Sequence, residues 1–125
     1  MIVLVDANAL LAWLVDPTEL REDARAAIAD PLNDVLVSAA TVWELEIKRA
    51  LGKLAAPEDL LGAIDSEHMI CLPVTGEDGV QAARLPPNHR DPFDRVLVAQ
   101  ACRLDAVIVT RDRAFETYDV SVIRA

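Results

Sequence analysis

Two unbroken apolar runs, each leading to an aspartate, limit the possible fold of this chain more than any other feature. Residues 2–5 lead directly into Asp6, and residues 107–109 are followed three positions later by Asp112. Apolar runs without polar alternation are typical of parallel strands that are covered on both faces. The carboxyl ends of such strands share the sheet edge where α/β proteins bind ligands. We therefore expect both aspartates at one site.

The rest of the chain alternates short strands with helices. Pro92 follows a capping Asp91 and opens the clearest helix, whose residues are apolar nearly all round, so burial on more than one side is expected. Further strands are expected at 35–37, 69–72 and 120–123, and helices at 7–15, 17–30, 41–51, 58–66, 77–85 and 92–104. This alternation predicts one α/β domain over 1–125, with a mostly parallel sheet of about five strands between helical layers.

Composition and terminal patterns narrow the class of protein. The sequence shows no signal-peptide pattern and no apolar run near the ~18 residues that cross a bilayer, so a cytoplasmic protein without membrane contact is expected. Cys71 and Cys102 are far apart and belong to no C-x-x-C motif. We expect buried free thiols rather than a zinc site or a redox pair.

The formal net charge of −9 argues against a nucleic-acid partner, because phosphates are bound by lysine and arginine. If several of the acids are metal ligands, bound divalent ions would make the local charge of the site positive. Basic residues also flank the candidate acids in the sequence: Lys48, Arg49, Lys53, Arg90, Arg95, Arg111 and Arg113. A local basic rim is therefore compatible with the overall charge.

Four carboxylates from separate segments are expected near this sheet edge: Asp6, Glu44, Asp94 and Asp112. Each also has a structural interpretation. Asp6 can cap the following helix, and Asp94 at the third helical position favours the helix dipole. Glu44, in the first turn of a helix that opens at Thr41, can complete a capping box or pair with Lys48. Asp112 can be a turn residue.

Together these acids indicate a cation. Four like charges within a few ångströms would repel, and some would have to protonate. Oxygen donors without His or Cys favour Mg²⁺ or Mn²⁺ over Zn²⁺. A two-ion arrangement can stabilise both the attacking and the leaving oxygen in phosphodiester hydrolysis, so the carboxylates themselves need not attack.

Several polar side chains are candidates for contact with a substrate. Asn8 can orient a carboxylate or a water, or only form a local hydrogen bond. Arg111 can hold a phosphate, or stay solvated as most surface arginines do. Lys48, Arg49 and Arg95 are weaker candidates for the same phosphate-holding role.

Two histidines and two tryptophans are expected to be structural. His68 and His89 have no obvious orienting partner in the sequence, which a general base needs. Trp13 and Trp43 fall at core-compatible helix spacings, so burial is expected rather than base stacking.

Four segments, in order along the chain, resemble the PIN domain family, in particular VapC-type toxins of VapBC toxin–antitoxin modules. They are IVLVDAN at 2–8, SAATVWEL at 38–45, HRDPFDRVLVAQA at 89–101, and TRD at 110–112 followed by Phe115. The resemblance implies that Asp6, Glu44, Asp94 and Asp112 bind metal, with Asp91 as an extra acid of open role.

The same resemblance implies a Mg²⁺- or Mn²⁺-dependent endoribonuclease with an α/β/α sandwich. It also implies a homodimer that is silenced by a small VapB-type antitoxin, whose tail brings a basic side chain to the acids. Residues 52–88 match no fixed motif, so the RNA that is cut is not implied.

The sequence fits three other functions less well or leaves them open. A receiver domain needs adjacent acids after the first strand and a late lysine, but this chain has a lone Asp6 and no lysine after Lys53. A phosphatase of the haloacid-dehalogenase kind needs D-x-D where this chain has Asp6-Ala7-Asn8. A catalytically inactive binding module stays open as an alternative.

Overall fold

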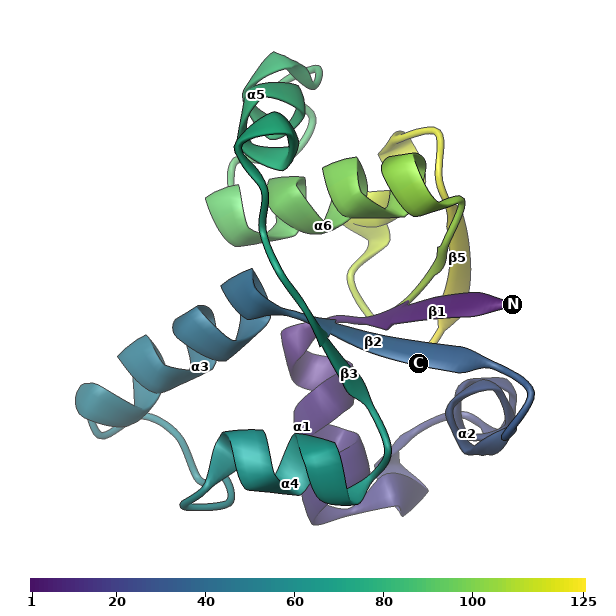
Figure 1. Cartoon of the computed structure of the whole chain (residues 1–125), viewed down its shortest axis with the longest axis vertical. Helices are drawn as coiled ribbons and strands as arrows, with labels where there is room; N and C mark the ends of the chain where they lie inside the picture. Colours follow the sequence, from purple (N-terminus) through teal and green to yellow (C-terminus); the bar gives the residue numbers. More distant parts are fainter.

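A computed structural model describes all 125 residues and shows a five-stranded, fully parallel sheet between two layers of helices (Figure 1). The strand order is β3-β2-β1-β4-β5. The strands are β1 (Ile2–Val5), β2 (Asp34–Ser38), β3 (Ile70–Leu72), β4 (Val107–Thr110) and β5 (Ser121–Arg124). This arrangement confirms the predicted α/β class. The central strands β1 and β4 pair directly, with Leu4 opposite Ile108.

Alternate residues of the central strands build two separate cores. Val3, Val5 and Val109 face a core shared with α1 (Ala7–Val15), α2 (Glu22–Ala29), α3 (Ala39–Ala50) and α4 (Leu60–Ser66). Leu4 and Ile108 face a second core shared with α6 (Pro92–Leu104) and Phe115. Because side chains alternate along a strand, β1 and β4 are buried on both faces, as their unbroken apolar runs predict.

Helix α6 is the most deeply buried helix of the second layer. One side packs on the sheet, and α5 (Gly76–Arg84) covers another (Figure 1). The Arg103 Nε donates to Asp78 Oδ1 at 2.7 Å and joins the two helices. The predicted burial on more than one side is therefore confirmed.

Three predicted helix starts are wrong; one is that of α4, which begins at Leu60 rather than Glu58 because Asp59 is its N-cap. The segment 17–30 is not one helix: Asp16 caps a single 3-10 turn (Pro17–Glu19), and the chain is extended at Leu20 before α2 begins. Helix α3 begins at Ala39 rather than Thr41, because the Ser38 hydroxyl accepts the Ala40 N–H at 3.1 Å. No capping box forms at Thr41, which is buried within the helix.

The predicted burial of the cysteines and of Trp43 is also wrong. Cys71 and Cys102 are both exposed; Cys71 lies on the edge strand β3, which has a neighbour on one side only. Trp43 is 65% exposed although one edge of its ring contacts Phe93, while Trp13 is partly buried and donates its indole N–H to Glu67. Helical spacing identifies one face of a helix but does not show whether another element covers it.

The fold brings several strand ends and helix starts together at the carboxyl edge of the sheet. There β1 ends before Asp6 and β4 before Asp112, α6 begins, and α3 leads away from the end of β2 (Figure 1). None of the helices combines the length and the apolar character needed to cross a membrane.

Candidate metal centre

Asp6 is the most buried of the four acids, with 4% of its surface exposed. It caps α1: its Oδ1 accepts the Ala9 N–H at 2.9 Å. Its Oδ2 accepts a short hydrogen bond from the Thr110 hydroxyl at the end of β4. The capping interpretation is therefore correct, and it coexists with a place in the acidic cluster.

Thr110 connects the first acid to the last. Its hydroxyl donates to Asp6 and also accepts the Asp112 N–H at 3.0 Å. Thr110 is fully buried, whereas the Asp112 side chain is 44% exposed and caps a 3-10 turn (Arg113–Thr117) through the Ala114 N–H. The Thr110 hydroxyl thus fixes both the Asp6 carboxylate, which follows β1, and the Asp112 backbone, which follows β4.

The N-terminus of α6 supplies two further acids, as expected from the Asp-Pro sequence. Asp91 is the N-cap, and its Oδ1 accepts the N–H groups of Phe93 at 2.9 Å and Asp94 at 3.4 Å. Asp94 stands at the third helical position, and its side chain is 16% exposed. The cap and Pro92 set the start of the helix, and this start places Asp94 in the cluster.

Glu44 reaches the cluster from the second turn of α3, not the first, because that helix begins at Ala39. Its side chain is 12% exposed and accepts a hydrogen bond of 2.9 Å from Lys48, the predicted i,i+4 pair. Lys48 also lies near Asp91 and Asp94. The Glu44 hydrogen bond, together with the charges of those two aspartates, raises the pKa of the Lys48 ammonium.

His89 stands between two of the acids, so the prediction that it is isolated is wrong. Its Nε2 lies 2.7 Å from Asp94 Oδ2 and 3.3 Å from Asp112 Oδ2, although neither contact has hydrogen-bond geometry. The donor atoms of the three residues all lie within 4.8 Å of one another. An imidazole nitrogen therefore stands beside the carboxylate oxygens that the sequence predicts.

The acids perturb one another electrostatically, which shows that they share one site. Burial, together with the charges of Asp91, Glu44 and Asp6, raises the pKa of Asp94 to about 7, while His89 opposes the rise. Burial likewise raises the pKa of Asp6, and the charges of Glu44 and Asp112 add to this effect. The structure therefore brings the four predicted acids together.

The cluster fits a divalent cation. Lys48 is the only lysine or arginine that forms an ion pair with any of the four acids, so most of their charge is uncompensated. The buried His89 Nε2 has no hydrogen-bond partner, which is costly for a polar atom. Carboxylate oxygens are suitable ligands for Mg²⁺ or Mn²⁺, which would neutralise the acids, and an ion that also accepted the imidazole nitrogen would remove both penalties.

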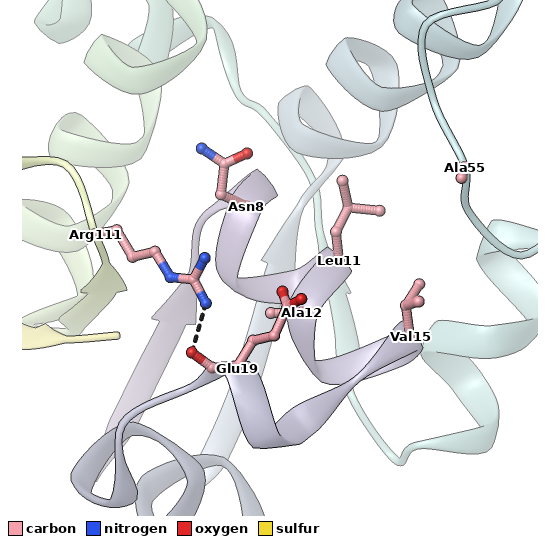
Figure 2. Close-up of a pocket in the computed structure, with 7 residues that line it drawn as sticks. All are labelled: Asn8, Leu11, Ala12, Val15, Glu19, Ala55 and Arg111. Atoms are coloured by element: carbon pink, nitrogen blue, oxygen red, sulfur yellow. Dashed lines mark hydrogen bonds between the residues drawn. The ribbon is translucent and has the colours of Figure 1, made fainter.

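A pocket of about 300 Å³ lies next to the cluster, beside α1 (Figure 2). Asn8 follows Asp6 by two residues, Arg111 precedes Asp112, and both line one side of the pocket. Leu11, Val15 and Ala55 line the other side, with the Glu19 carboxylate between the two groups. The guanidinium of Arg111 is anchored by a 2.7 Å hydrogen bond from Nη2 to the Glu19 carbonyl.

Two other candidate phosphate ligands have structural contacts. The Arg95 guanidinium donates to the Tyr118 hydroxyl and to four backbone carbonyls, those of Ala83, Leu85, Pro86 and His89. Arg49 donates to the carbonyls of Ala56 and Pro57. These bonds favour structural roles for both arginines, and leave Lys48 and Arg111 as the better placed cations.

Sequence reasoning left the role of Thr110 open and missed that of His89. Thr110 directly precedes the Arg111-Asp112 pair. A threonine at the end of a strand is only a weak indication that its hydroxyl bonds the acid after the neighbouring strand. The stronger signal was the position of His89 within the acidic motif, two residues before the capping Asp91. Its partners come from both Asp94 and Asp112, which only the folded chain brings together.

The raised pKa of Asp94 predicts a pH dependence for the metal-free protein. Between about pH 3.8, the pKa of Asp94 in the unfolded chain, and about pH 7, Asp94 is protonated in the folded state but mostly ionised in the unfolded state. The free energy of unfolding therefore falls as the pH rises through this window. Urea unfolding in EDTA at pH 5 and pH 8 checks this: the stability of the wild type relative to Asp94→Asn should be lower at pH 8. A pH-independent difference between the two proteins would contradict the assignment.

Comparisons with known proteins agree with this geometry. The chain matches the family model for the PIN domain over residues 3–121. No curated protein sequence matches the chain. Solved structures match it over nearly their full length, at identities that show a shared fold only.

Three of these structures illustrate the similarity. FitAcB from Neisseria gonorrhoeae has a TM-score of 0.65 at 22% identity, covering 98% of this chain and 96% of that chain. VapBC2 from Rickettsia felis, bound to a DNA fragment from its promoter, has a TM-score of 0.73 at 13% identity, covering 98% of each. VapBC-5 from Mycobacterium tuberculosis, of the VapBC family of toxin–antitoxin systems, has a TM-score of 0.62 at 22% identity, covering 99% and 98%. With a family model matched along almost all of its length, the chain belongs to the PIN domain family.

Proposed function

We propose that this chain is a metal-dependent endoribonuclease that acts as the toxin of a type II toxin–antitoxin system in the cytoplasm. The observation that carries the proposal is the convergence of Asp6, Glu44, Asp94 and Asp112: neighbouring carboxylates raise the pKa of Asp6 and of Asp94, and only Glu44 is paired with a lysine or arginine. Membership of the PIN family supports it and removes the receiver-domain alternative.

In this proposal Asp6 and Asp94 are the primary ligands of Mg²⁺ or Mn²⁺, and Glu44 and Asp112 complete the site directly or through water. When bound, the ion supplies an activated water as nucleophile and neutralises charge on the phosphate. The chain's own contribution is positioning: Thr110 and the Ala9 N–H hold Asp6, and the α6 cap holds Asp94. Lys48 stands beside Glu44 as a second contact for a phosphate. The carboxylates need not attack phosphorus, so no covalent intermediate forms.

The pocket beside α1 is proposed to hold a nucleotide that flanks the cleaved bond. Its volume of about 300 Å³ falls at the lower end of the range of ligand pockets, about 300–1,000 Å³. The aliphatic side chains offer a surface for a base, while Asn8 and Arg111 offer polar groups for its edge or for a phosphate. An ordered Arg111 contributes more per contact than a mobile surface arginine, because less conformational entropy is lost on binding.

Replacing Asp6 by asparagine tests the metal-dependent cleavage. The amide keeps nearly the same shape and can still cap α1, but it lacks the charge that holds a cation. We expect an approximately 100-fold or larger fall in the rate of RNA cleavage, the scale on which a single electrostatic stabiliser acts, with little change in thermal unfolding.

Asp59→Asn is the matched control, because Asp59 also caps a helix, through the Gly62 N–H, and takes no part in the cluster. It should cleave as the wild type does. Wild-type cleavage that EDTA does not stop, or cleavage retained in Asp6→Asn, would contradict the proposal. A wild type that cleaves no RNA with either ion would favour the alternative of an inactive binding module.

Arg111→Ala tests the proposed nucleotide pocket. The loss of a charge-assisted hydrogen bond, about 1.5–3 kcal/mol, should raise KM for an RNA oligonucleotide about tenfold or more while kcat changes little. Arg113→Ala removes an exposed arginine from the other side of Asp112 and should leave KM unchanged. Equal KM values for the two variants would count against the pocket.

A VapB-type antitoxin is proposed as the protein partner. The structural relatives include VapBC and FitAcB assemblies, and an acidic site with uncompensated charge suits a basic side chain of such a partner. This contact would compete with the metal ion for the same carboxylates.

A homodimer is also proposed, through the groove between α3 and α6. This groove of about 460 Å³ is lined almost entirely by apolar residues, among them Trp43, Val74, Phe93 and Val96. Trp43 packs edge-on against Phe93, with ring centroids 5.4 Å apart, yet remains 65% exposed. A large exposed apolar surface on a folded chain is typical of an interface.

Sedimentation velocity at micromolar concentration checks the dimer. The wild type should sediment as a dimer and Trp43→Glu as a monomer, because a buried unpaired charge opposes association. Leu32→Glu, at a position that is 87% exposed and outside the groove, should remain dimeric. A monomeric wild type would contradict this part of the proposal.

A further inference from the structure

We propose that His89 Nε2 is a ligand of the same ion, so that the centre combines one imidazole nitrogen with carboxylate oxygens and binds Mn²⁺ more tightly than Mg²⁺. The inference rests on the proposed metal site and specifies its donor set. Its basis is the position of Nε2, 2.7 Å from Asp94 Oδ2 and 3.3 Å from Asp112 Oδ2. One ion can reach all three donor atoms, since they lie within 4.8 Å of one another.

Only a long hydrogen bond to Nδ1 favours the ring tautomer that keeps the proton on Nε2. This atom is buried and has no hydrogen-bond partner, whereas Nδ1 accepts a long bond of 3.4 Å from the Asp91 N–H. Buried polar atoms in folded proteins are nearly always partnered. A neutral ring can coordinate through Nε2 after its one proton moves to Nδ1, at the expense of the long Asp91 bond alone.

The segment before α6 is fixed in a way that holds the ring in the cluster. Arg95 donates to the His89 carbonyl at 3.1 Å and to the Pro86 carbonyl at 3.0 Å. The Tyr118 hydroxyl accepts the His89 N–H at 3.0 Å and donates to the Pro86 carbonyl at 2.8 Å. The Phe115 ring meets the imidazole edge-on at 5.9 Å. Side chains from α6 and from the turn before β5 thus position His89 before any ion binds.

The donor set has a consequence for the choice of metal. Mg²⁺ prefers oxygen ligands and loses its waters reluctantly, while imidazole suits transition metals. Mn²⁺ accepts carboxylate oxygens as Mg²⁺ does, and as a transition-metal ion it also accepts an imidazole nitrogen, although it binds such sites least tightly of the first-row divalent ions. The contribution of His89 should therefore be larger for Mn²⁺ than for Mg²⁺.

Isothermal titration of the full chain with Mn²⁺ and, separately, with Mg²⁺ tests the inference. His89→Ala should weaken Mn²⁺ binding about tenfold or more, the scale of losses at metal sites, and Mg²⁺ binding clearly less. His68→Asn is the matched control: His68 is exposed, lies outside the cluster, and has a φ of 59° that asparagine tolerates. It should bind both ions as the wild type does.

Pulsed EPR of the Mn²⁺-loaded wild type gives a readout that does not depend on the folding of a variant. A ligated imidazole should appear as nitrogen hyperfine coupling, which His89→Asn should lose and His68→Asn should keep. Absence of this coupling, or an unchanged Mn²⁺ affinity in His89→Ala, would overturn the role of His89 while the carboxylate site stands. A wild type that binds neither ion would overturn both this inference and the proposed function.

Discussion

The hydrogen bond from Thr110 to Asp6 joins residues 104 positions apart, and the arrangement of the whole site depends on it. It ties the end of β4 to the residue that follows β1, and the same hydroxyl accepts the Asp112 N–H. A carboxylate as buried as Asp6 keeps its charge only at a cost, as the rise in its pKa through burial shows. The fold therefore concentrates negative charge where it is least solvated, and a cation is the simplest way to neutralise it.

The acids differ in how firmly the chain holds them, and this gives each a different part in the site. Asp6 and Asp94 stand at the N-termini of α1 and α6, where the helix starts fix their backbone, so their positions are set before any ligand arrives. Glu44 is paired with Lys48, and Asp112 is 44% exposed. The first two suit direct coordination, while the other two can adjust to water, ion or substrate.

Much of this site could be predicted from the sequence because its signals are local. The apolar runs before Asp6 and Asp112 identified the two central strands, and the Asp-Pro pair identified the start of α6. The start of α3 was missed because Ser38, the last residue of β2, competes with Thr41 as a cap. The exposure of Trp43 was missed because helical spacing does not show which neighbour, if any, covers a face.

The place of His89 could not be predicted for a different reason, which is that its environment is built from distant residues. Tyr118, whose hydroxyl accepts the His89 N–H, lies 29 positions away from it. Arg95 donates its hydrogen bonds to backbone carbonyls that no pattern in the sequence identifies. Arg95 reads as a candidate phosphate ligand in the motif, yet in the folded chain it shapes the segment that delivers the histidine. Arg95 of the acidic motif thus helps to hold His89 beside the carboxylates, where we propose that it binds the same ion.

Anomalous diffraction from crystals grown with Mn²⁺ tests the central claim most directly, because it locates the ion without reference to activity. The account predicts a manganese peak within coordinating distance of the carboxylates of Asp6 and Asp94, with Glu44 and Asp112 around it. Fully occupied manganese elsewhere, with these four side chains directed away from one another, would contradict it.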